Sequence, residues 1–211
     1  TLEYAYSDWC LSVLAEDLGC KEAAAEYFER SRSYSKVFDE EQGWFRPRNA
    51  DGTWKEWPEE GRLKESYGCV ESNLYQQGWF VPHDISGMAD LMGGRTKTLA
   101  DLTNFFEKCP SDFLWNAYYN HANEPVHHVP FLFNRLGAPW LTQYWTRAIC
   151  NGAYKNKVEG LVGNEDVGQM SAWYVLSAMG FHPVCPGETR YELTTPLFDR
   201  VEIKLDDRYA K

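Results

Sequence analysis

The sequence lacks any apolar run long enough to span a bilayer, and it is short of positive charge. Its 21 Lys and Arg residues are outnumbered by 31 Asp and Glu, which gives a net charge of -10. An acidic chain is a poor match for nucleic acid or for an anionic membrane surface. We therefore expect neither nucleic-acid binding nor membrane insertion.

Signatures of zinc sites and of nucleophilic hydrolases are also missing. The six Cys residues are scattered without CxxC spacing, and we expect them to be mostly buried free thiols. There is no HExxH motif, and His127 and His128 would point about 100° apart on a helix, which disfavours a shared zinc ion. No serine lies in a nucleophile elbow.

Aromatic residues are abundant: 9 Trp, 13 Tyr and 11 Phe among 211 residues. Many aromatic rings in an acidic chain suit sugar binding, because the C–H faces of pyranose rings stack on them, but they also suit a bulky core. The length is sufficient for one domain with a sizeable core. Thr1 is not a natural start, so we expect that a preceding part is missing from this sequence.

Apolar periodicity predicts paired helices joined by short turns at Gly19 and Gly137. The predicted helices cover residues 1–18, 21–38, 84–92, 96–108, 125–136, 139–154 and 170–179, with a helical or mixed stretch over 71–81. Residues 39–63 form a small hairpin or an ordered loop, whose Trp residues either cover a site or pack on helices. Residues 190–205 alternate like a strand, with Val201, Ile203 and Leu205 on one side. That face needs another sheet, and none is evident in this chain.

Three polar clusters lie at or near predicted helix beginnings. They are Glu71-Ser72-Asn73 with Gln76, Gln77, His83 and Asp84; Asn123-Glu124 with His127 and His128; and Asn164-Glu165-Asp166 with Gln169. In a ring of helix hairpins, the loops at one end converge on a central pit. Distant acids can then meet there.

Glycoside hydrolysis needs two such acids, one protonated to assist the leaving oxygen and one ionised to activate water or to attack. Glu71, bordered by Val70 and aromatic residues, is the better acid, because apolar surroundings raise a carboxyl pKa. Asp166 is the better base, because N–H groups at the mouth of the helix over 170–179 favour a charged carboxylate.

The chain also resembles glycoside hydrolase family 92, which comprises calcium-dependent, inverting exo-α-mannosidases, mostly of bacteria that forage on mannans and N-glycans. The resemblance covers nearly the whole chain and is carried, in order, by TLEYAYSDW, PRNADGTW, VESNLYQQGWFVPHDISGMADLMGG, NEPVHHVPFLFNRLGAPWLTQ and GNEDVGQMSAWYVLSAMGFHPVCPG. It implies mannose-containing oligosaccharides as substrates, calcium as cofactor, and secretion to the periplasm or cell surface.

The fold that the resemblance implies is mainly α: a partial (α/α)6 toroid of helix hairpins with a short C-terminal β segment. Residues 1–188 would form the C-terminal part of the catalytic domain. Residues 189–211 would form a strand-like tail that packs on an N-terminal β-sandwich missing from this chain. Since half a toroid exposes apolar hairpin faces, we expect the chain alone to associate or to keep little activity.

The resemblance places the general acid at Glu71 and the base at Asp166, with Asn164 where some members carry an Asp that assists the base. Asn123 stands where α-1,2-specific members have His, which leaves the linkage open. The predicted substrate-binding residues are Asn123, Glu124, His83 and Asp84, and the residues expected near calcium are Asn73, Gln77 and Glu124.

Two alternatives remain open. One is a carbohydrate-binding α-toroid without turnover, and the other is a different α-toroid glycosidase or lyase. Calcium-dependent hydrolysis of mannobiose separates the first alternative from a mannosidase, and the anomer of the product separates the second.

Overall fold

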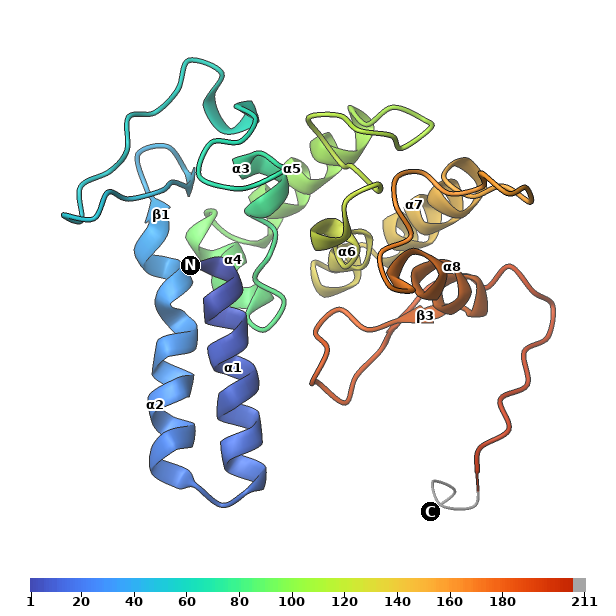
Figure 1. Ribbon diagram of the computed structural model, residues 1–211, viewed down its shortest axis with the longest axis horizontal. Helices are drawn as coiled ribbons and strands as arrows, with labels where there is room; N and C mark the ends of the chain where they lie inside the picture. Colours follow the sequence, from blue (N-terminus) through green and yellow to red (C-terminus); the bar gives the residue numbers. More distant parts are fainter. Residues whose placement is uncertain (207–211) are drawn as a thin grey trace.

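The computed structural model describes residues 1–206 and is mainly helical (Figure 1). The helices are α1 (Leu2–Asp17), α2 (Lys21–Ser31), α3 (Leu74–Gln77), α4 (Ile85–Leu91), α5 (Arg95–Glu107), α6 (Leu132–Arg135), α7 (Pro139–Gly152) and α8 (Gln169–Met179). The 3-10 helices are η1 (Arg32–Val37), η2 (Gly61–Leu63), η3 (Glu124–Val126) and η4 (Val129–Phe131). Two antiparallel pairs, β1 (Phe38–Asp39) with β2 (Trp44–Phe45) and β3 (Phe181–His182) with β4 (Glu192–Leu193), complete the elements.

Helices α1 and α2 lie side by side and extend away from the other helices as a hairpin (Figure 1). Gly19 closes the turn between them at φ 74°, in the left-handed region that glycine adopts without steric cost. Ser12 Oγ donates to the carbonyl of Ala24 at 3.0 Å, and Asp8 pairs with Arg30 at 2.9 Å. The predicted αα-hairpin is therefore confirmed.

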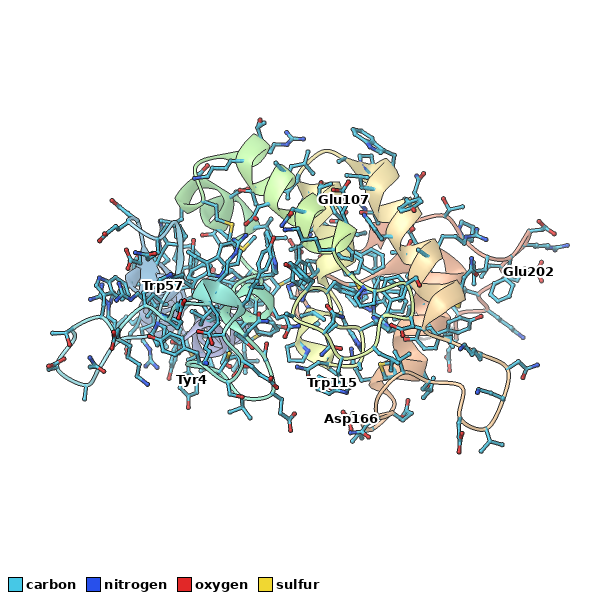
Figure 2. The ribbon with its side chains drawn as sticks, turned by 90° about the horizontal axis from the view of Figure 1, so that it is seen from above. Tyr4, Trp57, Glu107, Trp115, Asp166 and Glu202 are labelled. Carbon is cyan, nitrogen blue, oxygen red and sulfur yellow. The ribbon has the colours of Figure 1, made fainter. Side chains whose placement is uncertain are left out.

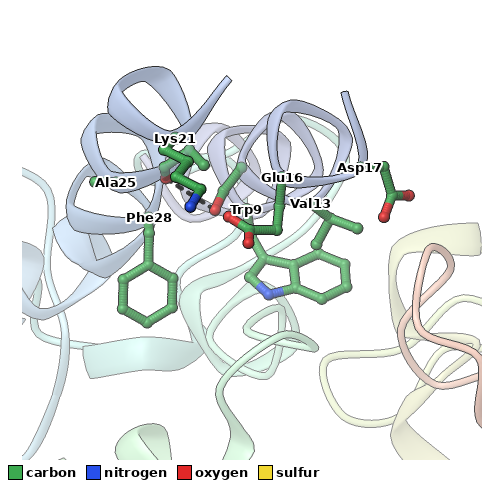
Figure 3. A pocket seen from close by; sticks show the side chains of 9 residues that line it. Trp9, Val13, Glu16, Asp17, Lys21, Ala25 and Phe28 are labelled. Carbon is green, nitrogen blue, oxygen red and sulfur yellow. Dashed lines mark hydrogen bonds between the residues drawn. The ribbon is translucent and has the colours of Figure 1, made fainter. Parts of the chain in front are cut away.

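A groove of about 460 Å³ lies between the C-terminal half of α1 and the N-terminal half of α2 (Figure 3). Trp9 and Phe28 supply its aromatic lining, and Glu16, Asp17 and Lys21 bring charge to its rim. None of the candidate site residues lines this groove. The chemistry predicted from the sequence therefore has to be sought elsewhere in the chain.

The core is built from aromatic side chains, each of which stabilises the fold by about 1.5–3 kcal/mol when it leaves water. The largest fully buried ones are Trp44, Trp79, Trp173, Tyr75, Tyr119, Phe105, Phe106, Phe131 and Phe133. Trp44 follows the β1–β2 turn, contacts Trp79 at 5.2 Å between ring centroids, and donates Nε1–H to the carbonyl of Leu74 at 2.7 Å. Trp54 stays on the surface loop under the guanidinium of Arg48, 3.5 Å from the ring centroid. These Trp residues pack on α3 and on their own loop.

Three predicted helices are much shorter than expected. The helix predicted over 21–38 is α-helical only in α2 and continues as the 3-10 helix η1. Only α3 is α-helical within residues 71–81, because Asn73 caps its start and Gly78 ends it. The predicted helix over 125–136 is divided into η3, η4 and α6. Pro130 lies inside that stretch and has no N–H to continue an α-helical ladder, which explains the break.

The C-terminal tail differs from its prediction as well. Within residues 190–205 only β4 is a strand, and it finds its partner inside this chain, in β3 directly after α8. Arg135 of α6 forms salt bridges with Glu188 and Glu192 and ties the start of the tail to the helices. The predicted strand face of Val201, Ile203 and Leu205 is not formed, because the three side chains are exposed and residues 200–206 pair with no strand among the described residues. The rest of the tail, residues 207–211, lies outside the described residues.

We predict that Trp44→Phe lowers the free energy of unfolding by about 2 kcal/mol, because it removes the hydrogen bond from Nε1 to the Leu74 carbonyl and leaves part of the buried ring volume unfilled. Thermal unfolding should show a lower melting temperature. The matched control is Trp140→Phe on α7, where the side chain is 62% exposed and the change should stay within about 0.5 kcal/mol. Equal melting temperatures for the two variants would contradict the packing role of Trp44.

Candidate functional site

The three polar clusters predicted from the sequence supply segments that meet in the structure. Asn123 Nδ2 donates to the backbone carbonyl of Glu71 at 3.0 Å, which joins the segment before α3 to the segment that begins η3. Gly163 lies so close to Ala122 that a Cβ added to Gly163 would stand 2.8 Å from the Ala122 Cβ and carbonyl oxygen. The turn that carries Asp166 therefore starts beside Asn123 and Glu124.

Glu124 interacts electrostatically with both other candidate acids. Burial raises its pKa above the ordinary value of 4.5, and the negative charges of Asp166 and Glu71 raise the pKa further. Its Oε1 is buried and has no hydrogen-bond partner among residues 1–206. Glu71, Glu124 and Asp166 are therefore neighbouring carboxyl groups at one site.

Glu71 has a left-handed backbone, with φ 52°, a conformation that costs a non-glycine residue about 1–2 kcal/mol. The hydrogen bond from Asn123 to its carbonyl holds that conformation. The Glu71 side chain is exposed, and the neighbouring Val70 is 84% exposed. The apolar wall that was predicted to make Glu71 the better acid is therefore not supplied by Val70.

The turn before α8 holds three consecutive residues in the left-handed region: Asp166 at φ 49°, Val167 at φ 57° and Gly168 at φ 93°. This turn places the Asp166 side chain on the surface, where Figure 2 shows it at an edge of the molecule on the same side as Trp115. Asn164 is exposed on the same turn. Backbone strain of this kind is common at functional sites.

We predicted that the N–H groups at the start of α8 would donate to Asp166. They donate to Glu165 instead. The Glu165 carboxylate accepts from the backbone N–H of Gly168 at 2.5 Å and from that of Ser171 at 3.1 Å. Hydrogen bonds from Ser171 and Gly168 hold the pKa of Glu165 below its ordinary value of 4.5. The sequence placed both acids at the helix mouth, but only the backbone path of the turn decides which one turns back to cap it.

The sequence did not predict a buried chain of hydrogen bonds near the candidate site. The Tyr119 hydroxyl donates to His121 Nδ1 at 2.8 Å, His121 Nε2 donates to the Tyr154 hydroxyl at 2.7 Å, and Tyr154 donates to the carbonyl of Met170 at 3.0 Å. The chain links the segment before η3 to the start of α8. Complete burial lowers the pKa of His121 well below its usual value, so the ring is neutral.

Of the four predicted substrate-binding residues, two lie beside the candidate acids and two lie elsewhere. Asn123 is buried and is used to hold Glu71, while Glu124 lies beside the other acids. His83 Nε2 donates to the carbonyl of Ser31 at 3.0 Å, and Asp84 caps α4 through Gly87 N at 2.8 Å while accepting from Tyr34 at 2.6 Å. His83 and Asp84 thus join α4 to α2 and η1, and neither forms a hydrogen bond with the candidate acids.

The predicted calcium ligands do not form one set. Asn73 Oδ1 accepts from the N–H of Gln76 at 2.9 Å as the cap of α3, and Gln77 Nε2 donates to Glu3 at 3.3 Å. Of the three, only Glu124 has a buried oxygen without a partner in residues 1–206. Within the same residues, no group of three or more His, Cys, Asp and Glu side chains could hold a metal ion. Asn73, Gln77 and Glu124 are thus not brought together as one set of ligands, and we assign no chemical step to the ion.

Known proteins resemble this chain over nearly its whole length. The profile described as the glycosyl hydrolase family 92 catalytic domain matches residues 1–210. A protein of Arthroderma benhamiae named as an uncharacterized secreted glycosidase is 30% identical over 97% of this chain and 28% of its own length. Among the part of the chain that the structure describes, no helix is both long and apolar enough to cross a membrane.

Solved structures of family 92 enzymes also resemble this chain. A family 92 α-mannosidase of Bacteroides thetaiotaomicron superposes with a TM-score of 0.85 at 34% identity, over 92% of this chain and 26% of that protein. An inverting family 92 mannosidase from the same bacterium has a TM-score of 0.82 at 35% identity, over 93% of this chain and 29% of that protein. The chain spans about a quarter to a third of these relatives, and the predicted mainly α fold class is confirmed.

We predict that Glu165→Gln lowers the melting temperature near neutral pH and that the difference from the wild type closes in acid. The folded-state pKa of Glu165 is lowered, so the ionised cap stabilises α8 above the ordinary value of 4.5. That contribution is lost as the pH falls below 4.5 and through the lowered pKa. Thermal unfolding as a function of pH tests this, with Glu159→Gln, an exposed acid in the preceding loop, as the control. A pH-independent difference would show that Glu165 does not act as a charged cap.

Proposed function

This chain belongs to glycosyl hydrolase family 92, and from that membership we propose that the protein containing it hydrolyses terminal α-linked mannose from mannans or N-glycans. The observation that supports the proposal best is the meeting of Glu71, Glu124 and Asp166, which come from distant parts of the chain. Two carboxyl groups in different protonation states are what glycoside hydrolysis requires. The chain supplies three neighbouring carboxyl groups, and burial raises the pKa of one of them, Glu124.

In the proposed mechanism, Glu71 donates its proton to the glycosidic oxygen as the bond to the anomeric carbon breaks. Asp166 accepts a proton from the water that attacks the same carbon from the opposite face, so the configuration inverts and the first product is β-mannose. Asn164 lies two residues before Asp166 on the same turn and is proposed to orient that water, since an amide can donate and accept hydrogen bonds but takes no proton.

Three further parts of the proposal rest on the family and on its relatives. We propose that activity depends on calcium, whose usual ligands are carboxylate and carbonyl oxygens. We propose secretion to the periplasm or cell surface, in line with the relative named as secreted. We also propose that residues 1–211 alone are inactive, because the chain covers only 26% of the α-mannosidase it resembles.

The catalytic assignment predicts that Glu71→Gln and Asp166→Asn, made in the full-length protein, each lower kcat on an aryl α-mannoside by at least about 100-fold. Glu107→Gln is the matched control, because Glu107 is an exposed acid on α5 that Figure 2 shows far from Asp166. Proton NMR of the wild-type reaction should show β-mannose before mutarotation. Wild-type rates in both variants, or α-mannose as the first product, would refute the mechanism.

Removal of calcium gives a separate prediction. Treatment of the full-length protein with a calcium chelator should abolish hydrolysis of mannobiose, and added calcium, but not magnesium, should restore it. The reason is that calcium accepts flexible sets of six to eight oxygen ligands, whereas magnesium requires a strict octahedron. Undiminished turnover in chelator would remove calcium from the proposal and leave the acid and base assignments intact.

A further inference from the structure

Gln169 lies at the junction between the two segments that carry the acids. It is the first residue of α8, and its backbone N–H donates to the carbonyl of Asp166 at 3.1 Å. Its side-chain amide nitrogen stands 3.2 Å from Nδ1 of His127, a residue that follows Glu124 by one short 3-10 turn. The Gln169 amide therefore connects the Asp166 turn to the Glu124 segment, and it does so at the surface.

The contacts of His127 determine which way this amide faces. His127 Nε2 lies 3.0 Å from the backbone carbonyl of His121, which can only accept, so Nε2 carries the hydrogen. Burial lowers the pKa of His127 to about 4, so the ring is neutral near neutral pH and Nδ1 is an acceptor. Only the NH₂ group of Gln169 can donate to it.

Packing keeps His127 in this orientation. The ring is 2% exposed and stacks on His121 with centroids 4.6 Å apart, and its backbone carbonyl accepts from Trp173 Nε1 at 2.8 Å. With NH₂ held by the buried ring, the amide oxygen Oε1 of Gln169 must point the other way. That oxygen has no hydrogen-bond partner within residues 1–206, and Gln169 is exposed.

We infer that Gln169 is a substrate-binding residue whose Oε1 accepts a hydrogen bond from one hydroxyl group of the sugar, and that His127 is the positioning residue that fixes this acceptor. The inference rests on the proposed function, because it places a mannose ring between Asp166 and Glu124. A pyranose hydroxyl is the complementary donor. A pre-oriented acceptor binds it without first losing amide rotation.

The test is a coupling experiment between one side chain and one substrate hydroxyl in the full-length protein. Values of kcat/KM are measured for an aryl α-mannoside and for its 2-, 3-, 4- and 6-deoxy analogues, in the wild type and in Gln169→Leu. We expect Gln169→Leu to lower kcat/KM on the parent about tenfold, the size of one lost neutral hydrogen bond. On one deoxy analogue the variant and the wild type should differ less than twofold, because the partner hydroxyl is already absent.

Two further variants separate binding from general structural effects. His127→Gln keeps a donor for the His121 carbonyl but lacks the Nδ1 acceptor, so it should lose discrimination against the same deoxy analogue as Gln169→Leu. Gln143→Leu, an exposed residue on α7, is the matched control and should behave like the wild type. Melting temperatures are measured for all variants, since Gln169 is exposed and its replacement should fold even where that of His127 does not.

Each outcome decides the question. An equal loss on the parent and on every deoxy analogue would mean that Gln169 acts only on the fold, and it would overturn this inference while leaving the proposed function in place. A wild-type rate for Gln169→Leu on all substrates would do the same. A full-length protein without activity on any α-mannoside would overturn both.

Discussion

Three like charges at one place are the constraint on which this structure depends. Glu71, Glu124 and Asp166 would repel one another if all were ionised, and the structure shows how the repulsion is limited. Glu71 and Asp166 are exposed, where water and salt screen their charges. Glu124 is partly buried, and its raised pKa favours the neutral form. The raised pKa of Glu124 thus limits the repulsion between this acid and the other two.

The forces that hold the acids together are uncharged. Hydrogen bonds from Asn123 to Glu71, and from Tyr119 through His121 and Tyr154 to the start of α8, join the three segments. The imidazole rings in this region are buried and neutral, so they contribute geometry and no positive charge. These neutral rings place no positive charge beside Glu124, whose pKa is raised by burial and by the neighbouring acids.

The helices that begin or end at Gly and Pro were predictable from the sequence, and α1, α5, α7 and α8 lie within a few residues of their predicted bounds. The meeting of the polar clusters followed from the idea that hairpin loops share one end of the fold. The hydrogen bonds of the individual acids could not be predicted from the sequence. Which of Glu165 and Asp166 caps α8 depends on three successive left-handed residues, and nothing in the letters E-D-V-G marks Val167 as one of them. The pairing of β4 with β3 was missed because a two-residue strand is too short to give a periodic signal.

The bond between Asn123 and Glu71 has a consequence for the exchange of loops between related enzymes. The backbone of one acid is held by a side chain that lies 52 residues further along the polypeptide. A chimera that keeps the native segment around Glu71, but imports from a relative a segment with another residue at position 123, would keep the carboxyl group and lose the donor that holds its main chain. The two segments depend on each other structurally, so a library built to alter specificity would need to recombine them together.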